Sequence, residues 1–339
     1  MDIKSMRIGV VGAGSWGTAI ASLLGMNGFG VDLWALEQEV ADSINDKHEN
    51  NLFLSGLALS ENVRASTDLT SVVSDKKLVV IVVPSHVFRD VASRMTKDLL
   101  PSAVIVSASK GIENKTHLTM SGIMAETFGE AVNNRLAVLS GPSFAREVAV
   151  KVPTVVTAAS VDAGVAKFVQ EVFAAPYFRV YTNSDVIGVE LGAAVKNVIA
   201  IASGIVDGLG LGLNTRAALI TRGLAEIQRL GVRLSANPHT FAGLSGVGDL
   251  ILTCTGTLSR NHTVGKMIGE GKTLAEILSS MRMVAEGVKT AHSVYNLSNK
   301  LGVEMPISHA VYAVLYEGLS AREAVYRLMT RNLKDEFDS

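Results

Sequence analysis

The sequence predicts an α/β protein in which a doubly wound, mostly parallel sheet precedes an all-helical domain. Up to about residue 185, short apolar runs typical of buried strands alternate with helical stretches, and such alternation favours a parallel sheet covered by helices on both faces. From about residue 190, apolar residues recur at helical spacing, and glycine-containing breaks separate the segments. The length of 339 residues also suits two domains, which we place at residues 1–187 and 188–339.

The composition narrows the class of protein. Hydrophobic residues make up 48% of the chain and charged residues 19%, which is enough apolar material for sizeable cores. The net charge of -1 gives no reason to expect a nucleic acid or another polyanion as partner. Cys254 is the only cysteine, so no disulfide can form within the chain, and no targeting segment is evident before the first strand. These features suit a cytoplasmic protein.

One apolar stretch, residues 186–213, is long enough to cross a membrane. It nevertheless contains Glu190, Lys196 and Asp207, and charged groups that face lipid are costly. The sequence therefore predicts a buried helix that lines a site, and no stable insertion into a membrane.

The first strand, residues 6–11, leads into a glycine-rich turn and then into a helix-type run at residues 18–26. The glycines are Gly12, Gly14 and Gly17, in the spacing G-x-G-x-x-G. The first permits a tight turn, the second lets a pyrophosphate approach the backbone, and the third lets the helix pack on the strand. The amides at the start of the helix favour negative charge. The turn predicts a Rossmann-type dinucleotide site, with a purely structural strand–turn–helix as the alternative.

The second strand, residues 31–35, bears on the choice of dinucleotide. Glu37 follows it and lies twenty residues after Gly17, where an acid accepts a hydrogen bond from an adenosine ribose hydroxyl. A 2′-phosphate would instead need a basic residue, and none is adjacent, although Lys47 or Arg64 could reach. The pattern favours NAD, and the alternative that Glu37 only caps the next helix stays open.

Six further strands continue the alternation, at residues 63–65, 78–83, 104–107, 136–140, 155–159 and 178–182. Doubly wound sheets bind ligands beyond the carboxyl ends of their strands, so we expect chemistry in the exit loops. Lys110 follows the strand at 104–107 and is well placed for a phosphate or a carbonyl oxygen, with a solvated lysine as the alternative. Gly141 and Ser143 follow the strand at 136–140; the glycine allows backbone approach, and the serine would contact a ligand or cap a helix.

In the second domain we predict helical segments at residues 190–208, 215–230, 240–254, 260–270, 273–281, 286–301, 306–317 and 320–330. Lys196, in the first of them, shares a face with small residues such as Gly192 and Ala200 and therefore faces a cavity. Burial disfavours the charged form of a lysine and lowers its pKa, which a general base near neutral pH requires. The alternative is a structural ion pair with Glu190 or Asp249.

Two more turns of the second domain carry polar groups. Asp249 ends a glycine turn, where it would cap a helix, accept a hydrogen bond from a substrate hydroxyl or position Lys196. Ser259, Arg260 and Asn261 precede a helix, and a helix start with arginine and asparagine makes a strong oxyanion site. Helix capping is the alternative for this trio.

Other catalytic classes find little support. The seven histidines have no close paired spacing, so no metal site is expected, and the hydrolase motif G-x-S-x-G is absent. A short polar break at residues 284–287 could touch a cofactor.

Motifs spread over nearly the whole chain agree with a single family. They lie at residues 12–19, 83–85, 110–111, 140–145, 191–197, 221–226, 246–250, 259–261 and 302–307. Together they closely resemble the bacterial NAD(P)-dependent glycerol-3-phosphate dehydrogenases. Spaced agreement of this kind is far more specific than the glycine turn alone.

The resemblance implies a role for each matched residue, with Lys196 as the proton acceptor. The residues that it implies for substrate binding are Lys110, Gly141, Ser143, Lys196, Asp249, Ser259, Arg260 and Asn261. Those that it implies for the cofactor, NAD or NADP, are Gly12, Gly14, Ser15, Trp16, Gly17, Lys110, Ala145, Arg260, Val284 and Glu286. It also implies a homodimer.

The implied activity is reversible hydride transfer that reduces dihydroxyacetone phosphate to sn-glycerol 3-phosphate for phospholipid synthesis. The chain departs from the family at Ala35 and Leu36, where members that use NADPH often carry a basic residue or a histidine. A hydroxyacid or ketopantoate-type reductase is one alternative, because a carboxylate substrate would also use Arg260 and Asn261. A non-enzymatic NADH sensor is another, although no basic recognition helix is evident.

Overall fold

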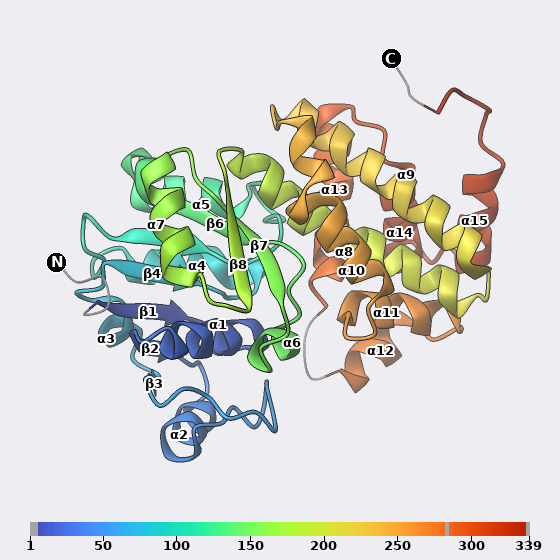
Figure 1. Ribbon diagram of the computed structural model, residues 1–339. Coiled ribbons are helices and arrows are strands. Elements are labelled where there is room, and N and C mark those ends of the chain that lie inside the picture. The colour runs from blue at the N-terminus through green and yellow to red at the C-terminus, as the bar shows by residue number, and fades with distance from the viewer. Residues whose placement is uncertain (1–5, 282–284, 337–339) are drawn as a thin grey trace.

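A computed structural model describes residues 6–281 and 285–336, and it places a sheet-containing half beside a helical half (Figure 1). The described strands form one sheet in the order β3-β2-β1-β4-β5-β6-β7-β8. Their bounds are β1 (Arg7–Val11), β2 (Gly30–Trp34), β3 (Val63–Ser66), β4 (Leu78–Ile81), β5 (Val104–Ser107), β6 (Leu136–Ser140), β7 (Thr154–Ala159) and β8 (Phe178–Asn183). Every neighbouring pair is parallel except β6 and β7. The eight predicted strands and the doubly wound, mostly parallel sheet are confirmed.

The strand order reverses at β1, which pairs with β2 on one side and with β4 on the other. Val11, the last residue of β1, lies opposite Trp34 in β2 and Ile81 in β4. Since β4, β5 and β6 run parallel to β1, their carboxyl ends meet along one edge of the sheet. The crevice beyond such a reversal is where doubly wound sheets bind ligands.

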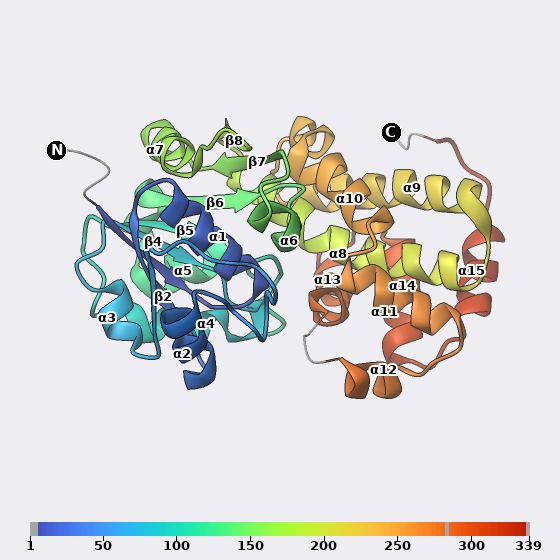
Figure 2. The same cartoon turned by 60° about the horizontal axis from the view of Figure 1, so that its bottom comes forward.

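Helices cover both faces of the sheet (Figure 2). Those of this half are α1 (Ser15–Met26), α2 (Gln38–Lys47), α3 (Leu69–Val73), α4 (Phe88–Met95), α5 (Met120–Phe128), α6 (Ala145–Ala149) and α7 (Ala163–Phe173), with the 3-10 turns η2 (Ser85–Val87) and η3 (Glu130–Arg135). One apolar core joins the sheet to α1, α2 and α7, and a second joins its other face to α3, α4 and α5. Because both faces of the sheet are buried, most strands consist of consecutive apolar residues and do not alternate apolar with polar ones.

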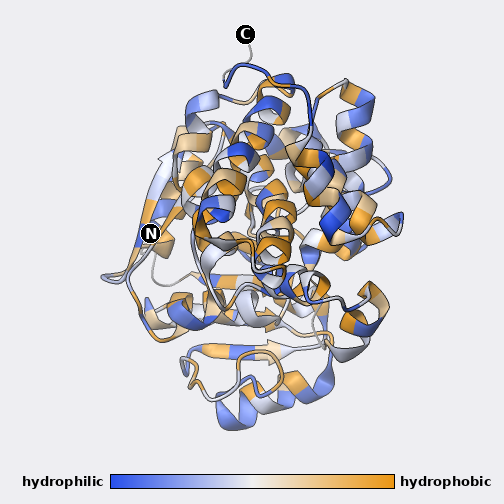
Figure 3. Ribbon diagram, turned by 90° about the vertical axis from the view of Figure 1, so that its right-hand side faces the viewer, coloured by the Kyte–Doolittle hydropathy of each residue, from blue (hydrophilic) through white to orange (hydrophobic). Residues whose placement is uncertain are grey.

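The helical half is built around α8 (Val186–Gly208). The other helices are α9 (Gly212–Arg233), α10 (Asp249–Thr255), α11 (Arg260–Gly269), α12 (Leu274–Ser280), α13 (Glu286–Leu301), α14 (Pro306–Tyr316) and α15 (Ala321–Met329). Of these, α9, α10, α11, α13 and α14 pack directly on α8. Although α8 is long and apolar enough to cross a membrane, 94% of its most apolar window is buried inside the protein. In Figure 3 apolar residues gather in the middle of this half and polar residues at its rim.

The helix predicted at residues 240–254 is interrupted. A 3-10 turn, η4 (Pro238–Ala242), and a π-helical turn, η5 (Leu244–Gly248), precede α10. Glycines in this stretch weaken its helical preference, and a Cβ on Gly246 would lie 2.1 Å from the carbonyl oxygen of Phe241. The interruption ends at Asp249, one of the residues predicted for the site.

The division of the chain at residues 187 and 188 stays a proposal. The last strand ends at Asn183 and α8 begins at Val186, so this division falls in the first turn of α8. Val189 of α8 packs with the core of the sheet, whereas Leu191 packs with the helical core. Helix α8 therefore contributes side chains to both halves.

Candidate active site

The turn after β1 has room where a pyrophosphate would lie. Gly12 has a φ of +117°, and a Cβ there would lie 2.7 Å from the carbonyl oxygen of Val82. A Cβ on Gly17 would lie 1.9 Å from the carbonyl oxygen of Gly12, so the packing of α1 on the turn requires glycine. A Cβ on Gly14 would instead meet nothing within 4 Å. An anion over Gly14 would face the first turn of α1, where helix amides attract negative charge.

Side chains next to this turn also suit a dinucleotide. The buried indole Nε1 of Trp16 has no hydrogen-bond partner among the residues that the structure describes. Ser15 Oγ donates to the carbonyl oxygen of Phe53 at 2.6 Å. Helix α6, which begins at Ala145, packs beside α1, so Ala145 starts a helix next to the one that carries the turn (Figure 2). The open space and the unused donor fit NAD or NADP.

The exit of β2 is exposed and acidic. Leu36 is 70% exposed just beyond the strand. Glu37 precedes α2 and occupies its N-cap position without a capping hydrogen bond from its side chain, and its role at the ribose stays a prediction.

Lys110 and Lys196, from opposite halves of the chain, contact the same carboxylate. Lys110 Nζ donates to Asp249 Oδ2 at 2.7 Å and to the carbonyl oxygen of Gly141 at 3.3 Å. Lys196 Nζ lies 3.1 Å from Asp249 Oδ1. The Lys110 side chain is only 18% exposed, so the solvated-lysine alternative is wrong. Asp249 is the first residue of α10 and caps no helix through its side chain.

The surroundings of Lys196 favour proton exchange near neutral pH. Lys196 is 4% exposed, and its Nζ also donates to Thr253 Oγ1 at 2.6 Å. Burial lowers the pKa of the Lys196 ammonium to about 8, although Asp249 acts in the opposite direction. Burial acts to raise the pKa of Asp249, but the ammonium groups of Lys110 and Lys196 hold it below its usual value. An ionised carboxylate beside a lysine of lowered pKa suits acid–base chemistry.

The other carboxylate considered for Lys196 has a different role. Glu190 is buried and accepts hydrogen bonds from the backbone N and the Oγ of Ser121, at the start of α5. Glu190 therefore joins α8 to the sheet half, whereas Asp249 forms the ion pair with Lys196.

The start of α11 is held in place by its own polar residues. Ser259 is the N-cap residue and accepts from the backbone N of His262, as predicted for a cap. Asn261 Oδ1 accepts from the backbone N of Gly287 at 2.9 Å, so its amide NH₂ is the group that stays available to a ligand. Arg260, between them, is exposed.

Two more predicted residues, Ser143 after β6 and Glu286 at the start of α13, make hydrogen bonds within the protein. Ser143 Oγ donates to the carbonyl oxygen of Gly141 at 3.0 Å and does not cap α6, so the capping alternative is wrong. Glu286 Oε2, in the first turn of α13, accepts from Ser85 Oγ at 2.7 Å. Val284 lies outside the described residues.

Contacts therefore join Lys110, Gly141, Ser143, Lys196 and Asp249 into one cluster. Sequence reasoning missed Thr253, which supports Lys196 from the same helix as Asp249. Its Oγ1 donates to the carbonyl oxygen of Asp249 at 2.6 Å. The spacing of four residues from Asp249 places Thr253 on the same helix face and was a usable signal.

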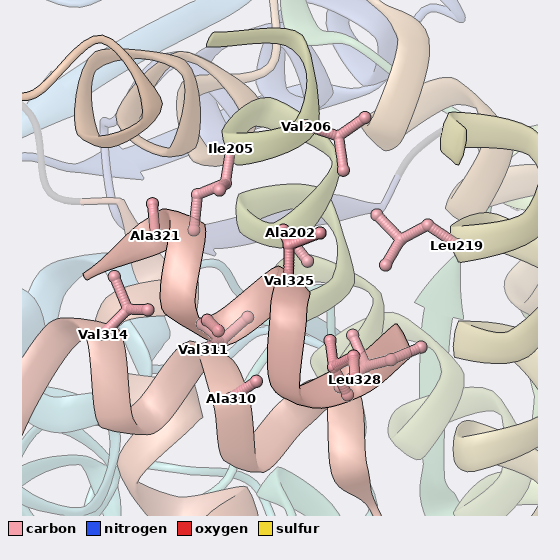
Figure 4. A pocket seen from close by; sticks show the side chains of 12 residues that line it. Ala202, Ile205, Val206, Leu219, Ala310, Val311, Val314, Ala321, Val325 and Leu328 are labelled. Atoms are coloured by element: carbon pink, nitrogen blue, oxygen red, sulfur yellow. The ribbon is translucent and has the colours of Figure 1, made fainter. Parts of the chain in front are cut away.

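Two other features of the described residues offer no competing site. A pocket among α8, α9, α14 and α15 is lined only by apolar side chains, such as Ile205, Val311 and Leu328 (Figure 4), and lacks a polar group to orient a substrate. Residues 6–281 and 285–336 contain no group of three histidine, cysteine, aspartate or glutamate side chains that could hold a metal ion.

The mostly parallel sheet has a first turn that suits a dinucleotide, and ionisable side chains from the helical half face it. These features define the class as a two-domain NAD(P)-dependent dehydrogenase. Residues 7–166 match the model of the NAD-dependent glycerol-3-phosphate dehydrogenase N-terminus, and residues 185–326 match that of its C-terminus. The chain belongs to this family.

Individual relatives agree with this assignment. A glycerol-3-phosphate dehydrogenase [NAD(P)+] of Citrifermentans bemidjiense is 58% identical over 330 residues, 97% of this chain and 98% of that protein. The crystal structure of glycerol-3-phosphate dehydrogenase from Coxiella burnetii matches with a TM-score of 0.92 and 39% identity, over 97% of this chain and all of that one. A ketopantoate reductase from Ralstonia eutropha shares the fold, with a TM-score of 0.58 and 14% identity over 94% of this chain and all of that one.

Proposed function

We propose that this chain catalyses the reversible, NAD(P)-dependent reduction of dihydroxyacetone phosphate to sn-glycerol 3-phosphate, a precursor of glycerophospholipids. One observation carries the proposal within the family: a single buried carboxylate, Asp249, holds the two lysines Lys110 and Lys196 at the exit edge of the sheet. Reduction of a ketone needs a proton donor, and it is accelerated by a second cation that stabilises the charge developing on the carbonyl oxygen; these lysines are suited to both tasks.

When bound, the dinucleotide supplies the hydride for the carbonyl carbon, or takes it up in the reverse direction. Lys196 donates a proton to the carbonyl oxygen during reduction and accepts it during oxidation. Lys110 polarises the same oxygen from the exit of β5. Asp249 orients both ammonium groups, and Thr253 supports Lys196 through the hydrogen bond between their side chains.

The substrate phosphate binds at the start of α11. Arg260 supplies charge, Asn261 supplies its amide NH₂, and Ser259 holds the first turn so that its backbone amides face the phosphate. Gly141 and Ser143 bound the substrate on the side of the sheet. Binding energy from the phosphate then orients the reacting carbon.

The cofactor binds along the first turn of α1, over Gly14 and against Ser15 and Trp16, where Gly12 and Gly17 shape the backbone. The resemblance adds Lys110, Ala145, Arg260, Val284 and Glu286 to this set. We propose that NADH is preferred over NADPH, because Leu36 and Glu37 at the exit of β2 would place an apolar and an acidic side chain near a 2′-phosphate.

We also propose that the protein is a cytoplasmic homodimer without stable membrane insertion. The homodimer rests on the family resemblance. The burial of α8 inside the protein supports the absence of membrane insertion. Sedimentation of the purified chain and fractionation of the cells that make it would test these points.

The deciding experiment compares substrates in a steady-state assay of NADH and NADPH oxidation. We expect turnover with dihydroxyacetone phosphate and little with 2-keto acids such as ketopantoate, which would be the substrates of the alternative reductase. Efficient turnover of a 2-keto acid, with none of dihydroxyacetone phosphate, would reject the proposal. Cofactor binding without oxidation in the presence of any keto substrate would favour an NADH sensor.

A further inference from the structure

The first turn of α13 connects the two halves of the candidate site through two consecutive residues. Glu286 Oε2 accepts from Ser85 Oγ at 2.7 Å, which ties it to the exit of β4. The backbone N of Gly287 donates to Asn261 Oδ1 at 2.9 Å, which ties it to the start of α11. The two contacts are thus made by adjacent residues. One reaches the edge of the sheet where the cofactor is proposed to bind, and the other reaches the helix start where the substrate phosphate is proposed to bind.

The Ser85 end of this connection is firmly placed. Ser85 is 5% exposed and begins the 3-10 turn η2. Gly111, the neighbour of Lys110, packs so closely that a Cβ on it would lie 2.5 Å from Ser85 Cβ. The position of Ser85 is therefore fixed by the chain segments that follow both β4 and β5. Its hydrogen bond to the Glu286 carboxylate is of the stronger, charge-assisted kind.

The Gly287 end is equally tight. A Cβ on Gly287 would lie 2.5 Å from the carbonyl oxygen of Asn197 and 2.8 Å from Asn261 Oδ1. Asn197 is the neighbour of Lys196 on α8. A shift of α13 would therefore disturb the orientation of the Asn261 amide and the helix that carries the proposed proton donor.

We propose that Ser85 is a positioning residue that, through Glu286, couples cofactor binding to substrate binding. The inference rests on the proposed function. A ligand that favours one position of so short a connection also favours the matching position of its other end, so the second ligand meets contacts that are already in place. Such coupling is reciprocal: the substrate tightens cofactor binding by the factor by which the cofactor tightens substrate binding.

The test measures this factor directly. NADH and sn-glycerol 3-phosphate cannot react with each other, so the Kd of NADH can be measured by fluorescence with and without saturating glycerol 3-phosphate. In the natural protein we expect glycerol 3-phosphate to tighten NADH binding. We call the ratio of the NADH Kd without glycerol 3-phosphate to the Kd with it the tightening factor. In Ser85→Ala we expect this factor to fall by about tenfold, because a hydrogen bond to a charged group is lost. If the natural factor is smaller than about ten, we expect it to fall to one, which means no coupling.

Two further variants give the test its controls. Ser93→Ala removes a hydroxyl that donates to the Arg89 carbonyl oxygen within α4, and it should leave the factor unchanged. Glu286→Ala should lower the factor as well, and adding Ser85→Ala to it should change the factor no further, because Ser85 acts through Glu286. If Ser85→Ala does not fold, Ser85→Cys takes its place, because a thiol keeps the bulk of the hydroxyl group but donates only weakly.

Several results would overturn the proposal. The first is a Ser85→Ala protein whose tightening factor equals that of the natural protein. The second is a Ser85→Ala change that lowers the factor equally in the natural protein and in Glu286→Ala. The third is a natural protein that turns over dihydroxyacetone phosphate but whose NADH binding is not tightened by glycerol 3-phosphate. The last result separates this inference from the proposed function, which would fail only if turnover itself were missing.

Discussion

Lys196 Nζ lies 3.1 Å from Asp249 Oδ1, in a place where both side chains are almost completely buried. The second oxygen of this carboxylate accepts from Lys110 at 2.7 Å. Asp249 therefore cannot turn toward one lysine without weakening its contact with the other. This arrangement holds the ammonium of Lys196 at a defined place relative to the exit of β5, as a proton donor to a bound ketone must be held.

Replacing Lys196 with methionine should abolish turnover, because the change removes the proton donor and keeps most of the side chain's bulk. We expect kcat with NADH and dihydroxyacetone phosphate to fall by at least about 100- to 10,000-fold. The Kd of NADH, measured by fluorescence, should stay near that of the natural protein. Lys266→Met is a matched control, since Lys266 is 54% exposed on α11. A Lys196→Met protein with full kcat would refute the assignment.

The pH dependence should follow the pKa of about 8 that burial produces at Lys196. Reduction needs the protonated ammonium, so kcat/KM for dihydroxyacetone phosphate should be level below that pH and decline above it. Oxidation needs the neutral amine, so kcat/KM for glycerol 3-phosphate should increase as pH rises through the same region. Rate profiles in both directions check the sign.

Asp249→Asn tests whether Lys196 causes the decline of kcat/KM for reduction at high pH, which we call the limb of the profile. The carboxylate acts to raise the pKa of Lys196, so its removal should move the limb of the reduction profile to lower pH. A limb that keeps its position in Asp249→Asn would belong to another group.

The fold was largely predictable because its strands and helices leave local patterns. Leu78–Ile81 is a continuous apolar run, and so is Val104–Ser107 up to its final serine, whatever strands lie beside them. Strand direction leaves no such pattern, so nothing in residues 155–159 indicates that β7 runs antiparallel to β6. The break between Ala242 and Asp249 was missed because its apolar residues keep helical spacing while its glycines pack against neighbouring backbone.

The candidate site was predictable only in part, because its contacts join distant residues. Lys110 and Asp249 are 139 positions apart, and Ser85 and Glu286 are 201 apart, so no local spacing predicts that they touch. Local reasoning did find the small residues around Lys196, and with them the lowered pKa. The choice of Asp249 over Glu190 as its partner depended on how α10 packs on α8.

Two glycines of the first turn should respond differently to alanine. Gly14→Ala meets only open space, so the protein should fold normally and lose affinity for NADH, whose pyrophosphate needs that space. Gly17→Ala forces a methyl against the Gly12 carbonyl oxygen and should cost about 1–3 kcal/mol of stability. Denaturant unfolding and NADH titration of both variants check this. Unchanged NADH affinity in Gly14→Ala would place the pyrophosphate elsewhere.

Cofactor preference should be reversible at the exit of β2. Leu36 is 70% exposed there and offers no partner to a 2′-phosphate, so Leu36→Arg should add a charge-assisted contact that only NADPH can use. We expect the ratio of kcat/KM for NADPH to that for NADH to rise by about tenfold. Leu213→Arg is the matched control, since Leu213 is 71% exposed on α9, and its ratio should not change. A natural protein that strongly prefers NADPH, or an unchanged ratio in Leu36→Arg, would show that other residues read the 2′ position, for example Arg64 on the neighbouring strand β3.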